Sequence, residues 1–249
     1  MDGDGSVQVN HWKKKSLQYR LVIKLKNDPD KYNLSLLKKI EYFIGGTVRV
    51  ESKEKFVLWV ENRPNKISEI INIFEKYPPL TTRLSLQLQF LHSSLKKNDI
   101  LWYLEERDKK YQYDKIERMY NKISNYKHFP HFNGWLSGFI EAEGYFTLRS
   151  NSSNNHSFSI SQKCDKFLLE KINLFFKGKK QVRLVANKKK KISESKQIPN
   201  SVVENCYYSF YWLEIYNKEV LKKVVSHCIS YPLYGEKQKS FLFFSKKIL

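Results

Sequence analysis

The sequence predicts an α+β protein of two pseudo-symmetric halves, each with a four-stranded antiparallel sheet covered on one face by helices. Three observations support this prediction: a diverged internal repeat, segments in which polar and apolar residues alternate, and segments with apolar residues three or four positions apart. Each half reads α-β-β-α-β-β-α, so that two hairpins build one four-stranded sheet. We expect the halves to be joined at a pair of helices, one at the start of each half.

The internal repeat rests on four short matches that keep their order along the chain. They are Asp4-Gly5 with Glu143-Gly144, Val48-Arg49-Val50 with Val182-Arg183-Leu184, Leu58-Trp59-Val60 with Tyr211-Trp212-Leu213, and Tyr77-Pro78 with Tyr231-Pro232. The offset jumps once, between the second and third matches, which indicates an insertion of about 19 residues in the second half. This insertion contains the lysine run 188–191. We place the first half at 1–95, a charged, tyrosine-rich linker at 96–130, and the second half at 131–249.

The elements of the first half follow from periodicity and from residues that favour helix ends. Strands are expected at 6–12, 17–26, 47–51 and 56–60, and helices at 33–45, 65–76 and 82–95. The strand at 17–26 alternates most clearly, because its odd-numbered positions are apolar and most even-numbered ones are polar or basic. Asn33 is the expected N-cap of the first of these helices, and Gly45 is its expected end.

The second half repeats this order. Asn133 and Asp165 are expected to cap helices that end near Glu143 and Gly178, and further helices are expected at 217–227 and from 236 onward. Strands are expected at 145–149, 157–162, 181–185 and 207–216. Trp59 and Trp212 occupy matching strand positions, and both are expected to pack within the protein instead of stacking on bases.

The charge of the chain restricts the class of partner. It has 45 Lys and Arg residues against 25 Asp and Glu residues, a formal net charge of +20 over 249 residues. Such a charge indicates a polyanionic partner, and nucleic acid is the first candidate because neutralising phosphates releases counterions. A membrane is a distant second, because no run of about 20 apolar residues is present. Three cysteines without a CxxC pair argue against a disulfide framework and a zinc ribbon.

The most informative segment is 135–144, with the sequence Trp-Leu-Ser-Gly-Phe-Ile-Glu-Ala-Glu-Gly. Gly138 and Ala142 lie on one helical face, where small residues let two helix backbones approach closely. Gly144 suits a position just past a helix end, where a left-handed conformation is common. The segment resembles the signature of the LAGLIDADG homing endonucleases, and two copies at this spacing resemble the single-chain members of that family.

The resemblance implies saddle-shaped sheets joined at the paired motif helices. It implies a monomeric, intron-encoded endonuclease that cuts double-stranded DNA at a long asymmetric site. It also implies a mitochondrial location, which agrees with the AT-rich coding indicated by only two alanines and an excess of Lys over Arg. Two alternatives remain. One is a maturase that binds group I intron RNA and has little or no nuclease activity, and the other is a DNA-binding protein without catalysis.

The expected metal site contains the carboxylates of Asp4 and Glu143, with Gly3 and Ala142 beside them at the two helix ends. Two carboxylates and two helix ends suit a hard divalent cation, Mg²⁺ or another such as Mn²⁺. A metal held there can activate water and stabilise the leaving oxygen of a phosphodiester.

Further catalytic residues are implied by the resemblance. A basic residue near the scissile phosphates at the start of the last helix of each half is matched by Lys237 and Arg83. Arg83 could equally contact phosphate without a catalytic effect. Gln162 matches a polar residue beside the metal, with Asn27 as its repeat counterpart, and both could equally be solvated amides at strand ends.

DNA reading is expected on the sheet face that the helices leave uncovered, because paired strands can enter the major groove. The nominated residues are Gln8, Asn10, Gln18, Arg20, Lys24, Arg49, Arg149, Ser159, Ser161 and Arg183. Any single one of them is more often a phosphate contact or a solvated charge than a base reader.

The first copy of the motif is incomplete, because Met1 matches Ile140 and residues 135–139 have no counterpart. We therefore expect a fragment of the first helix, from a chain that is truncated or continues from upstream coding sequence. Since a short helix is marginal by itself, cleavage is expected to be impaired while nucleic-acid binding persists.

Overall fold

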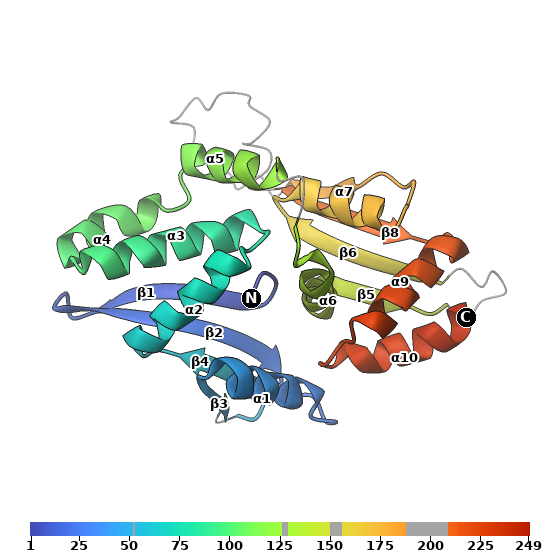
Figure 1. Ribbon diagram of the computed structural model, residues 1–249, viewed down its shortest axis with the longest axis horizontal. Coiled ribbons are helices and arrows are strands. Elements are labelled where there is room, and N and C mark those ends of the chain that lie inside the picture. Colours follow the sequence, from blue (N-terminus) through green and yellow to red (C-terminus); the bar gives the residue numbers. More distant parts are fainter. Residues whose placement is uncertain (52, 126–128, 150–155, 188–208) are drawn as a thin grey trace. The chain divides into compact units, whose positions relative to one another are not determined.

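The computed structural model describes the chain except for residue 52 and residues 126–128, 150–155 and 188–208. The described residues form two compact units, which Figure 1 shows coloured along the sequence. The first unit contains Met1–Met119 together with Tyr234–Glu236, and the second contains Tyr120–Leu233 and Lys237–Leu249. In the described part of the chain, we find no helix with the length and apolar character needed to cross a membrane.

The first unit contains an antiparallel sheet with the strand order β1-β2-β4-β3. Its strands are β1 (Gly5–Trp12), β2 (Ser16–Lys26), β3 (Thr47–Val50) and β4 (Phe56–Glu61). The alternation of β2 sets the two faces, because Tyr19, Leu21 and Ile23 are buried whereas Gln18 and Lys24 are exposed. One face of the sheet therefore carries the core and the other faces solvent.

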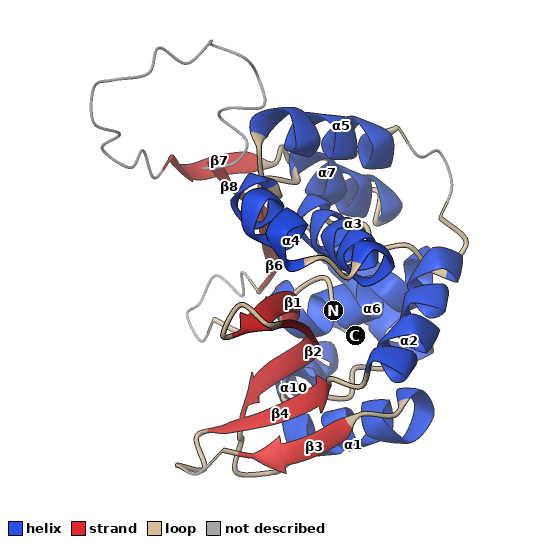
Figure 2. Ribbon diagram, turned by 90° about the vertical axis from the view of Figure 1, so that its left-hand side faces the viewer, coloured by secondary structure: helices blue, strands red, loops and turns tan. Residues whose placement is uncertain are grey.

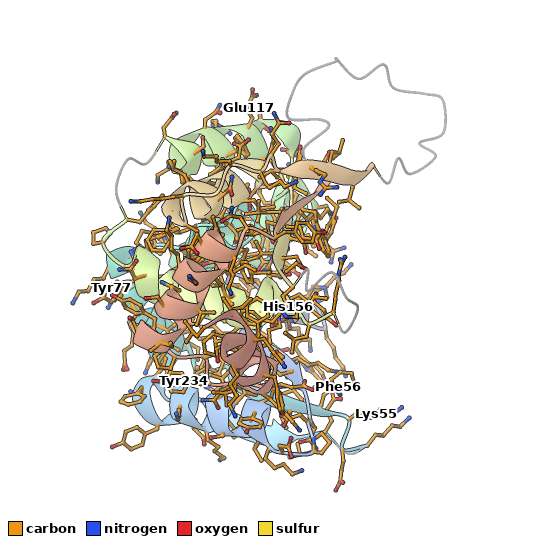
Figure 3. The ribbon with its side chains drawn as sticks, turned by 90° about the vertical axis from the view of Figure 1, so that its right-hand side faces the viewer. Lys55, Phe56, Tyr77, Glu117, His156 and Tyr234 are labelled. Atoms are coloured by element: carbon orange, nitrogen blue, oxygen red, sulfur yellow. The ribbon has the colours of Figure 1, made fainter. Side chains whose placement is uncertain are left out.

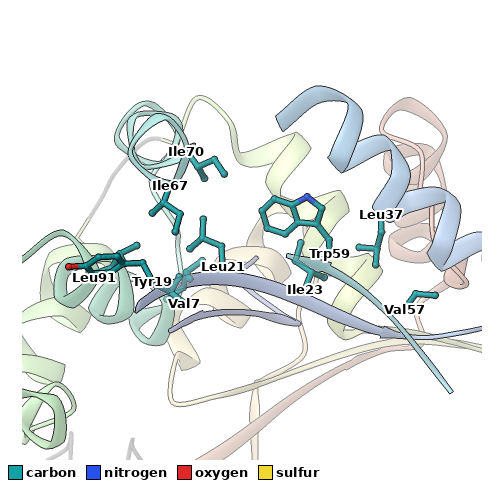
Figure 4. Packing of buried hydrophobic residues seen from close by; sticks show 11 residues of the cluster. Val7, Tyr19, Leu21, Ile23, Leu37, Val57, Trp59, Ile67, Ile70 and Leu91 are labelled. Atoms are coloured by element: carbon teal, nitrogen blue, oxygen red, sulfur yellow. The ribbon is translucent and has the colours of Figure 1, made fainter. Parts of the chain in front are cut away.

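Three helices supply the covering layer: α1 (Tyr32–Ile44), α2 (Pro64–Lys76) and α3 (Thr82–Lys97). Figure 2 shows α1 and α2 on one side of the strands. Apolar side chains from both layers form one core cluster (Figure 4), which consists of Val7, Tyr19, Leu21, Ile23, Leu37, Val57, Trp59, Ile67, Ile70, Leu84 and Leu91. The indole of Trp59 is 2% exposed and donates to the carbonyl oxygen of Gly45 at 2.7 Å, which ties the end of α1 to β4.

Residues Tyr234–Glu236 belong to the first unit although they are distant from it in sequence. The backbone N–H of Glu236 donates to Oδ1 of the buried Asn33 at 3.0 Å. The Glu236 carboxylate lies 3.5 Å from Nζ of Lys26. The ring of Tyr234, labelled in Figure 3, carries Nζ of Lys39 3.8 Å from its centroid. These three contacts attach the segment to α1 and to the end of β2.

The second unit repeats the arrangement with the strand order β5-β6-β8-β7. Its elements are α6 (Phe132–Glu143), β5 (Gly144–Thr147), β6 (Ser157–Lys163), α7 (Lys166–Phe175), β7 (Arg183–Asn187), β8 (Ser209–Ile215), α9 (Lys218–Ser230) and α10 (Lys237–Ile248). Its core is rich in phenylalanine, and the ring of Phe146 lies 5.4, 5.5 and 5.2 Å from those of Phe158, Phe241 and Phe244. The predicted α+β class with two four-stranded antiparallel sheets is confirmed.

In the sequence, α3 is followed by α4 (Ile100–Glu106), a short 3₁₀ helix (Arg107–Lys109) and α5 (Tyr113–Ser124), which precede the second sheet. The hydroxyl of Tyr103 on α4 donates to the carbonyl oxygen of Val9 at 3.1 Å. This buried tyrosine therefore fastens α4 to β1. The lysine run 188–191, expected to be a basic loop, lies outside the described residues.

Two of the expected helix caps are wrong. Helix α1 begins at Tyr32, and the carboxylate of Asp28 accepts from the backbone N–H groups of Tyr32 and Asn33 at 3.0 and 2.8 Å. An upstream carboxylate thus performs the role expected of Asn33. Asn133 lies inside α6 and donates to the hydroxyl of Tyr231 at 3.1 Å. Both amides are used for contacts distant in sequence, which local capping patterns do not reveal.

A buried carboxylate orders the turn between β4 and α2, and it makes the stability of the first unit depend on pH. Glu61 is 1% exposed and accepts from the backbone N–H of Arg63 at 2.9 Å and from its guanidinium at 2.6 Å. The hydrogen bond from the Arg63 guanidinium is the main cause that lowers the pKa of Glu61 below its ordinary value. A lowered folded-state pKa stabilises the protein above the unfolded-state pKa, and this contribution disappears as pH falls through the folded-state pKa.

We predict that Glu61→Gln lowers the free energy of unfolding at pH 7 by about 1–3 kcal/mol, because the charged hydrogen bonds are lost. The deficit should shrink as pH falls below the ordinary pKa of a glutamate and through the lower pKa of Glu61 in the folded protein. Urea unfolding over a pH series checks this, with Glu69→Gln, which removes a surface ion pair on α2, as the control. A deficit that is the same at every pH would contradict the prediction.

Candidate functional site

Both copies of the motif end in the same helical turn. The backbone N–H of Gly144 closes α6 by donating to the carbonyl oxygen of Ile140. In the first half, the backbone N–H of Gly5 donates to the carbonyl oxygen of Met1 at 3.0 Å. Residues 1–5 therefore form one turn that matches residues 140–144. The expected fragment of the first helix is present in this form.

The two glycines are needed for space. A Cβ atom on Gly144 would lie 2.7 Å from the carbonyl oxygen of Ile140, and one on Gly5 would lie 2.6 Å from that of Met1. Both distances are shorter than any ordinary contact, so the strand could not start this close to the helix end with a larger residue. Gly144 has an extended backbone with φ of −74°. The expected left-handed conformation is therefore wrong, and close approach is the reason for glycine.

A carboxylate two positions before each candidate metal ligand ties the motif to the last helix of its half. Oδ1 of Asp2 accepts from the backbone N–H of Thr81 at 3.0 Å and also from its hydroxyl, just before α3. In the second half, Oε1 of Glu141 accepts from the backbone N–H of Lys237 at 3.2 Å, at the start of α10. The N-terminus of a helix attracts negative charge, which favours both arrangements.

The cations predicted by the resemblance both bind main-chain oxygens of the motif. Arg83 donates through Nη2 to the carbonyl oxygens of Asp2 and Gly3 at 2.7 and 2.8 Å, and through Nη1 to that of Gly5 at 2.9 Å. Lys237 donates through Nζ to the carbonyl oxygen of Ala142 at 2.6 Å. Within each half, the structure thus brings the basic side chain to the residue that directly precedes Asp4 or Glu143.

The helix ends offer suitable donors for a divalent cation. Asp4 is exposed and Glu143 is half-buried, so neither carboxylate is sealed from solvent. Each is adjacent in sequence to a main-chain carbonyl oxygen, at Gly3 and Ala142, and such hard oxygens suit Mg²⁺ and Mn²⁺. The described residues contain no group of three or more His, Cys, Asp or Glu side chains that could hold a metal. An ion held here would complete its shell with water or phosphate oxygens.

Gln162 lies on the helix-covered face of its sheet and is 8% exposed. In β6 it follows Ile160, which pairs with Gly144, so it extends past the start of β5 toward the end of α6. The equivalent register in the first half pairs Gly5 with Ile23 and places Leu25 at the matching position. Asn27 is therefore not its repeat counterpart, because the offset between the halves changes within this hairpin.

The nominated residues of the first half share one face of the sheet. Gln8 pairs with Arg20, and Asn10 pairs with Gln18. Lys24 and Arg49 both pair with Leu58, on either side of β4. Lys24 also contacts Glu51, at 2.7 Å. The uncovered face therefore presents one pair of an amide with a basic residue, one pair of two amides, and one row with a cation at each end.

The second half places Ser161, Trp212 and Arg183 in one row of its uncovered face. This row is equivalent to that of Lys24, Leu58 and Arg49. Trp212 is half-buried on this face, so its expected equivalence to the buried Trp59 is wrong. Leu213 occupies the position that matches Trp59, and a shift of one residue moves a side chain to the opposite face of a sheet.

A polar cluster surrounds Glu214 in the neighbouring row. Ser159 pairs with Glu214 and is 2% exposed, and the hydroxyl of Ser157 donates to the Glu214 carboxylate at 3.1 Å. Arg149 lies beyond the end of β5, with Nη2 3.8 Å from the Glu214 carboxylate and its guanidinium 5.6 Å from the ring centroid of Tyr216. The hydrogen bond to Glu214 is the main cause that raises the pKa of Tyr216.

Sequence reasoning missed several residues of these surfaces. Asp2 and Glu141 share the offset of Asp4 and Glu143, so the repeat contained a signal for their common role. Gln87 had no such signal. Its side-chain oxygen accepts from the backbone N–H of Val7 at 3.1 Å, and its side-chain nitrogen donates to the Tyr111 hydroxyl at 2.8 Å. These contacts join residues far apart in the chain.

Comparisons with known proteins agree with this geometry. A model of the LAGLIDADG endonuclease family matches residues 1–94 and 136–248. The probable intron-encoded endonuclease aI3 of Dictyostelium citrinum is 43% identical over 245 residues, which cover 97% of this chain and 89% of that protein. A protein of the same name from Debaryomyces hansenii is 38% identical over 276 residues, and the match spans 99% of this chain and 36% of that protein.

Among solved structures, the LAGLIDADG homing endonuclease I-GzeII in complex with its DNA target has a similar fold, with a TM-score of 0.67. Its sequence is 20% identical, and the match covers 98% of this chain and 86% of that one. This likeness supports the fold assignment.

We predict that Gly144→Ala lowers the free energy of unfolding by about 1–3 kcal/mol, because the added methyl group forces the end of α6 away from β5. Gly134→Ala, in the same helix, is the matched control, since a Cβ there meets no atom within 4 Å. The control should be neutral or stabilising by up to about 1 kcal/mol, because alanine favours helices over glycine. Equal effects in thermal unfolding would show that close approach is not the constraint.

Proposed function

Because this chain belongs to the LAGLIDADG endonuclease family, we propose that it is a site-specific endonuclease that hydrolyses both strands of a DNA target with a divalent cation, Mg²⁺ or Mn²⁺. One observation carries the proposal. In each half, an acidic helix end and a basic side chain meet at one main-chain carbonyl oxygen, at Gly3 with Arg83 and at Ala142 with Lys237. A carboxylate, a carbonyl oxygen and a cation together are suited to holding a metal and a phosphate.

In the proposed mechanism, the helix end of each half would hold a divalent cation, through the Asp4 carboxylate and the Gly3 carbonyl oxygen in the first half and through the Glu143 carboxylate and the Ala142 carbonyl oxygen in the second. When bound, a divalent cation would polarise the attacking water and neutralise charge on the leaving oxygen. Lys237 and Arg83 then stabilise the charge that develops on the scissile phosphates. Gln162 supports the second-half helix end from the covered face of the sheet.

The uncovered sheet faces bind the target in this proposal. The residues proposed to contact DNA are Gln8, Asn10, Gln18, Arg20, Lys24, Arg49, Arg149, Ser161 and Arg183, whereas Ser159 is left out because it is 2% exposed. The two faces differ in chemistry, because the first carries amide and basic pairs whereas the second includes Trp212 and Glu214. Unequal faces suit a long asymmetric target and a chain that works as a monomer. The AT-rich coding indicated by the amino-acid composition and the similarity to intron-encoded proteins support a mitochondrial location.

We predict that Glu143→Gln reduces cleavage by roughly a hundredfold or more, because it removes a charged metal ligand while keeping the shape of the side chain. Cleavage of a plasmid library in Mg²⁺ measures this, and gel-shift binding in Ca²⁺ should be preserved. Glu117→Gln on α5 serves as the control. Undiminished cleavage would contradict the role of Glu143, and group I RNA binding without DNA cleavage by the wild type would favour a maturase.

We predict that Arg183→Ala weakens duplex binding and reduces the slope of log affinity against log salt by about one, because one phosphate contact is lost. Arg118→Ala, which removes an exposed cation from α5, should leave both quantities unchanged. Titration of labelled duplex over a salt series provides the measurement. If the two variants behave alike, the uncovered face is not the DNA surface.

A further inference from the structure

Two cationic side chains donate hydrogen bonds to the same carbonyl oxygens that are proposed to bind the metal. Nη2 of Arg83 lies 2.8 Å from the carbonyl oxygen of Gly3, and Nζ of Lys237 lies 2.6 Å from that of Ala142. These contacts occur within separate compact units, so neither depends on how the units are arranged. The same pairing, found twice in a diverged repeat, indicates a shared property of the two helix ends.

The positions of these oxygens make the contacts consequential. Gly3 and Ala142 are equivalent in the repeat, and each directly precedes a candidate metal-binding carboxylate. The last carbonyl groups of a helix lack intrahelical partners and attract positive charge. In the structure, the side-chain cations satisfy this requirement. A metal would satisfy it too, at an oxygen distance of about 2.1 Å for Mg²⁺.

We propose that Lys237 and Arg83 compete with a divalent cation for the helix-end carbonyl oxygens, so that each oxygen binds either the side chain or the metal. This inference rests on the proposed function for the position of the metal. An ammonium group at hydrogen-bond distance from Ala142 and a divalent cation on the same oxygen would be a few ångströms apart, and their repulsion is strong there. Lys237 and Arg83 would therefore leave these oxygens when a metal binds, and their charge would be free for a phosphate of the DNA.

The two residues differ in how they hold these oxygens. The planar guanidinium of Arg83 reaches the carbonyl oxygens of Asp2, Gly3 and Gly5 through two nitrogen atoms. An ammonium group is a compact point charge on a flexible stem and does not reproduce this fork. Arg83→Lys therefore keeps the charge of the site while it weakens the hold on Gly3. The Arg83→Lys variant therefore distinguishes competition for the Gly3 carbonyl oxygen from an effect of net charge on metal affinity.

The test measures Mn²⁺ binding by the 249-residue chain in the absence of DNA. Electron paramagnetic resonance reports the concentration of free Mn²⁺. We predict that Lys237→Met tightens Mn²⁺ binding about fivefold to tenfold, because a competing cation is removed. Arg83→Lys should tighten binding at unchanged net charge. Lys246→Met, which removes an exposed lysine from the last turn of α10, is the matched control and should change affinity by less than about twofold.

Three outcomes would overturn the inference: unchanged or weaker Mn²⁺ binding by both Lys237→Met and Arg83→Lys, no detectable binding by these variants, or an equal gain in Lys246→Met. Circular dichroism confirms that each variant is folded, and Arg83→Lys keeps the test decisive if Lys237→Met does not fold. The double variant Lys237→Met with Glu143→Gln should lose the increase in Mn²⁺ affinity. That loss would show that the metal binds at the end of α6. The Mn²⁺ measurement contains no DNA, so it is independent of the cleavage assay. A chain that fails to cleave DNA in that separate assay would contradict the proposed function but not the competition for the carbonyl oxygens.

Discussion

Each half of this protein depends on a hydrogen-bonded joint between the end of its motif and the start of its last helix. The joint uses the carboxylate of Asp2 in one half and that of Glu141 in the other, each two residues before an acidic candidate ligand. Because the acceptor belongs to the motif and the donor to the last helix, one contact fixes the carboxylate and the basic residue relative to each other. The glycine after each motif, Gly5 or Gly144, starts the first strand of its half directly after the helical turn. The helix end, the start of the sheet and the basic side chain therefore lie close together in each half.

The two halves have kept this joint while their uncovered sheet faces have diverged. Gln8 pairs with Arg20 across β1 and β2, whereas the matching pair of the second half is Thr147 with Ser157. The pair of Ser159 with Glu214 matches the apolar pair of Val22 with Val60 in the first half. The backbone register is the same in both halves at the start of the sheet, where Gly5 pairs with Ile23 and Gly144 with Ile160. A common scaffold with different surface chemistry would let the proposed DNA target contain two unlike half-sites.

Much of the fold could be predicted from the sequence, because strands with one buried face alternate and helices with one buried face repeat at three or four residues. The resemblance based on residues 135–144 is confirmed by the family match. The failures share a cause. Asn33 and Asn133 look like local caps but make contacts with Glu236 and Tyr231, and Trp212 was misplaced by a single residue of register. Register and distant hydrogen bonds depend on tertiary structure, which periodicity does not encode.

The candidate site could be predicted less fully than the fold. The motif located Asp4 and Glu143, and the family resemblance implied a basic residue at the start of the last helix of each half, which Arg83 and Lys237 match. It did not reveal that the two cations bind main-chain oxygens of the motif, because those contacts involve backbone atoms that every residue possesses. The catalytic and DNA-binding roles of the nominated residues stay predictions.

The attachment of Tyr234–Glu236 to the first unit affects how such proteins can be recombined. A gene cut within the segment between the sheets would yield a first half without the Glu236 backbone N–H, leaving the buried Oδ1 of Asn33 without that donor. An unsatisfied buried amide costs about 1–3 kcal/mol, a sizeable part of the stability of a small domain. The unit that evolution or an engineer can exchange is therefore discontinuous in sequence: a transplanted first half must bring this three-residue segment with it, or meet a compatible one in its new partner.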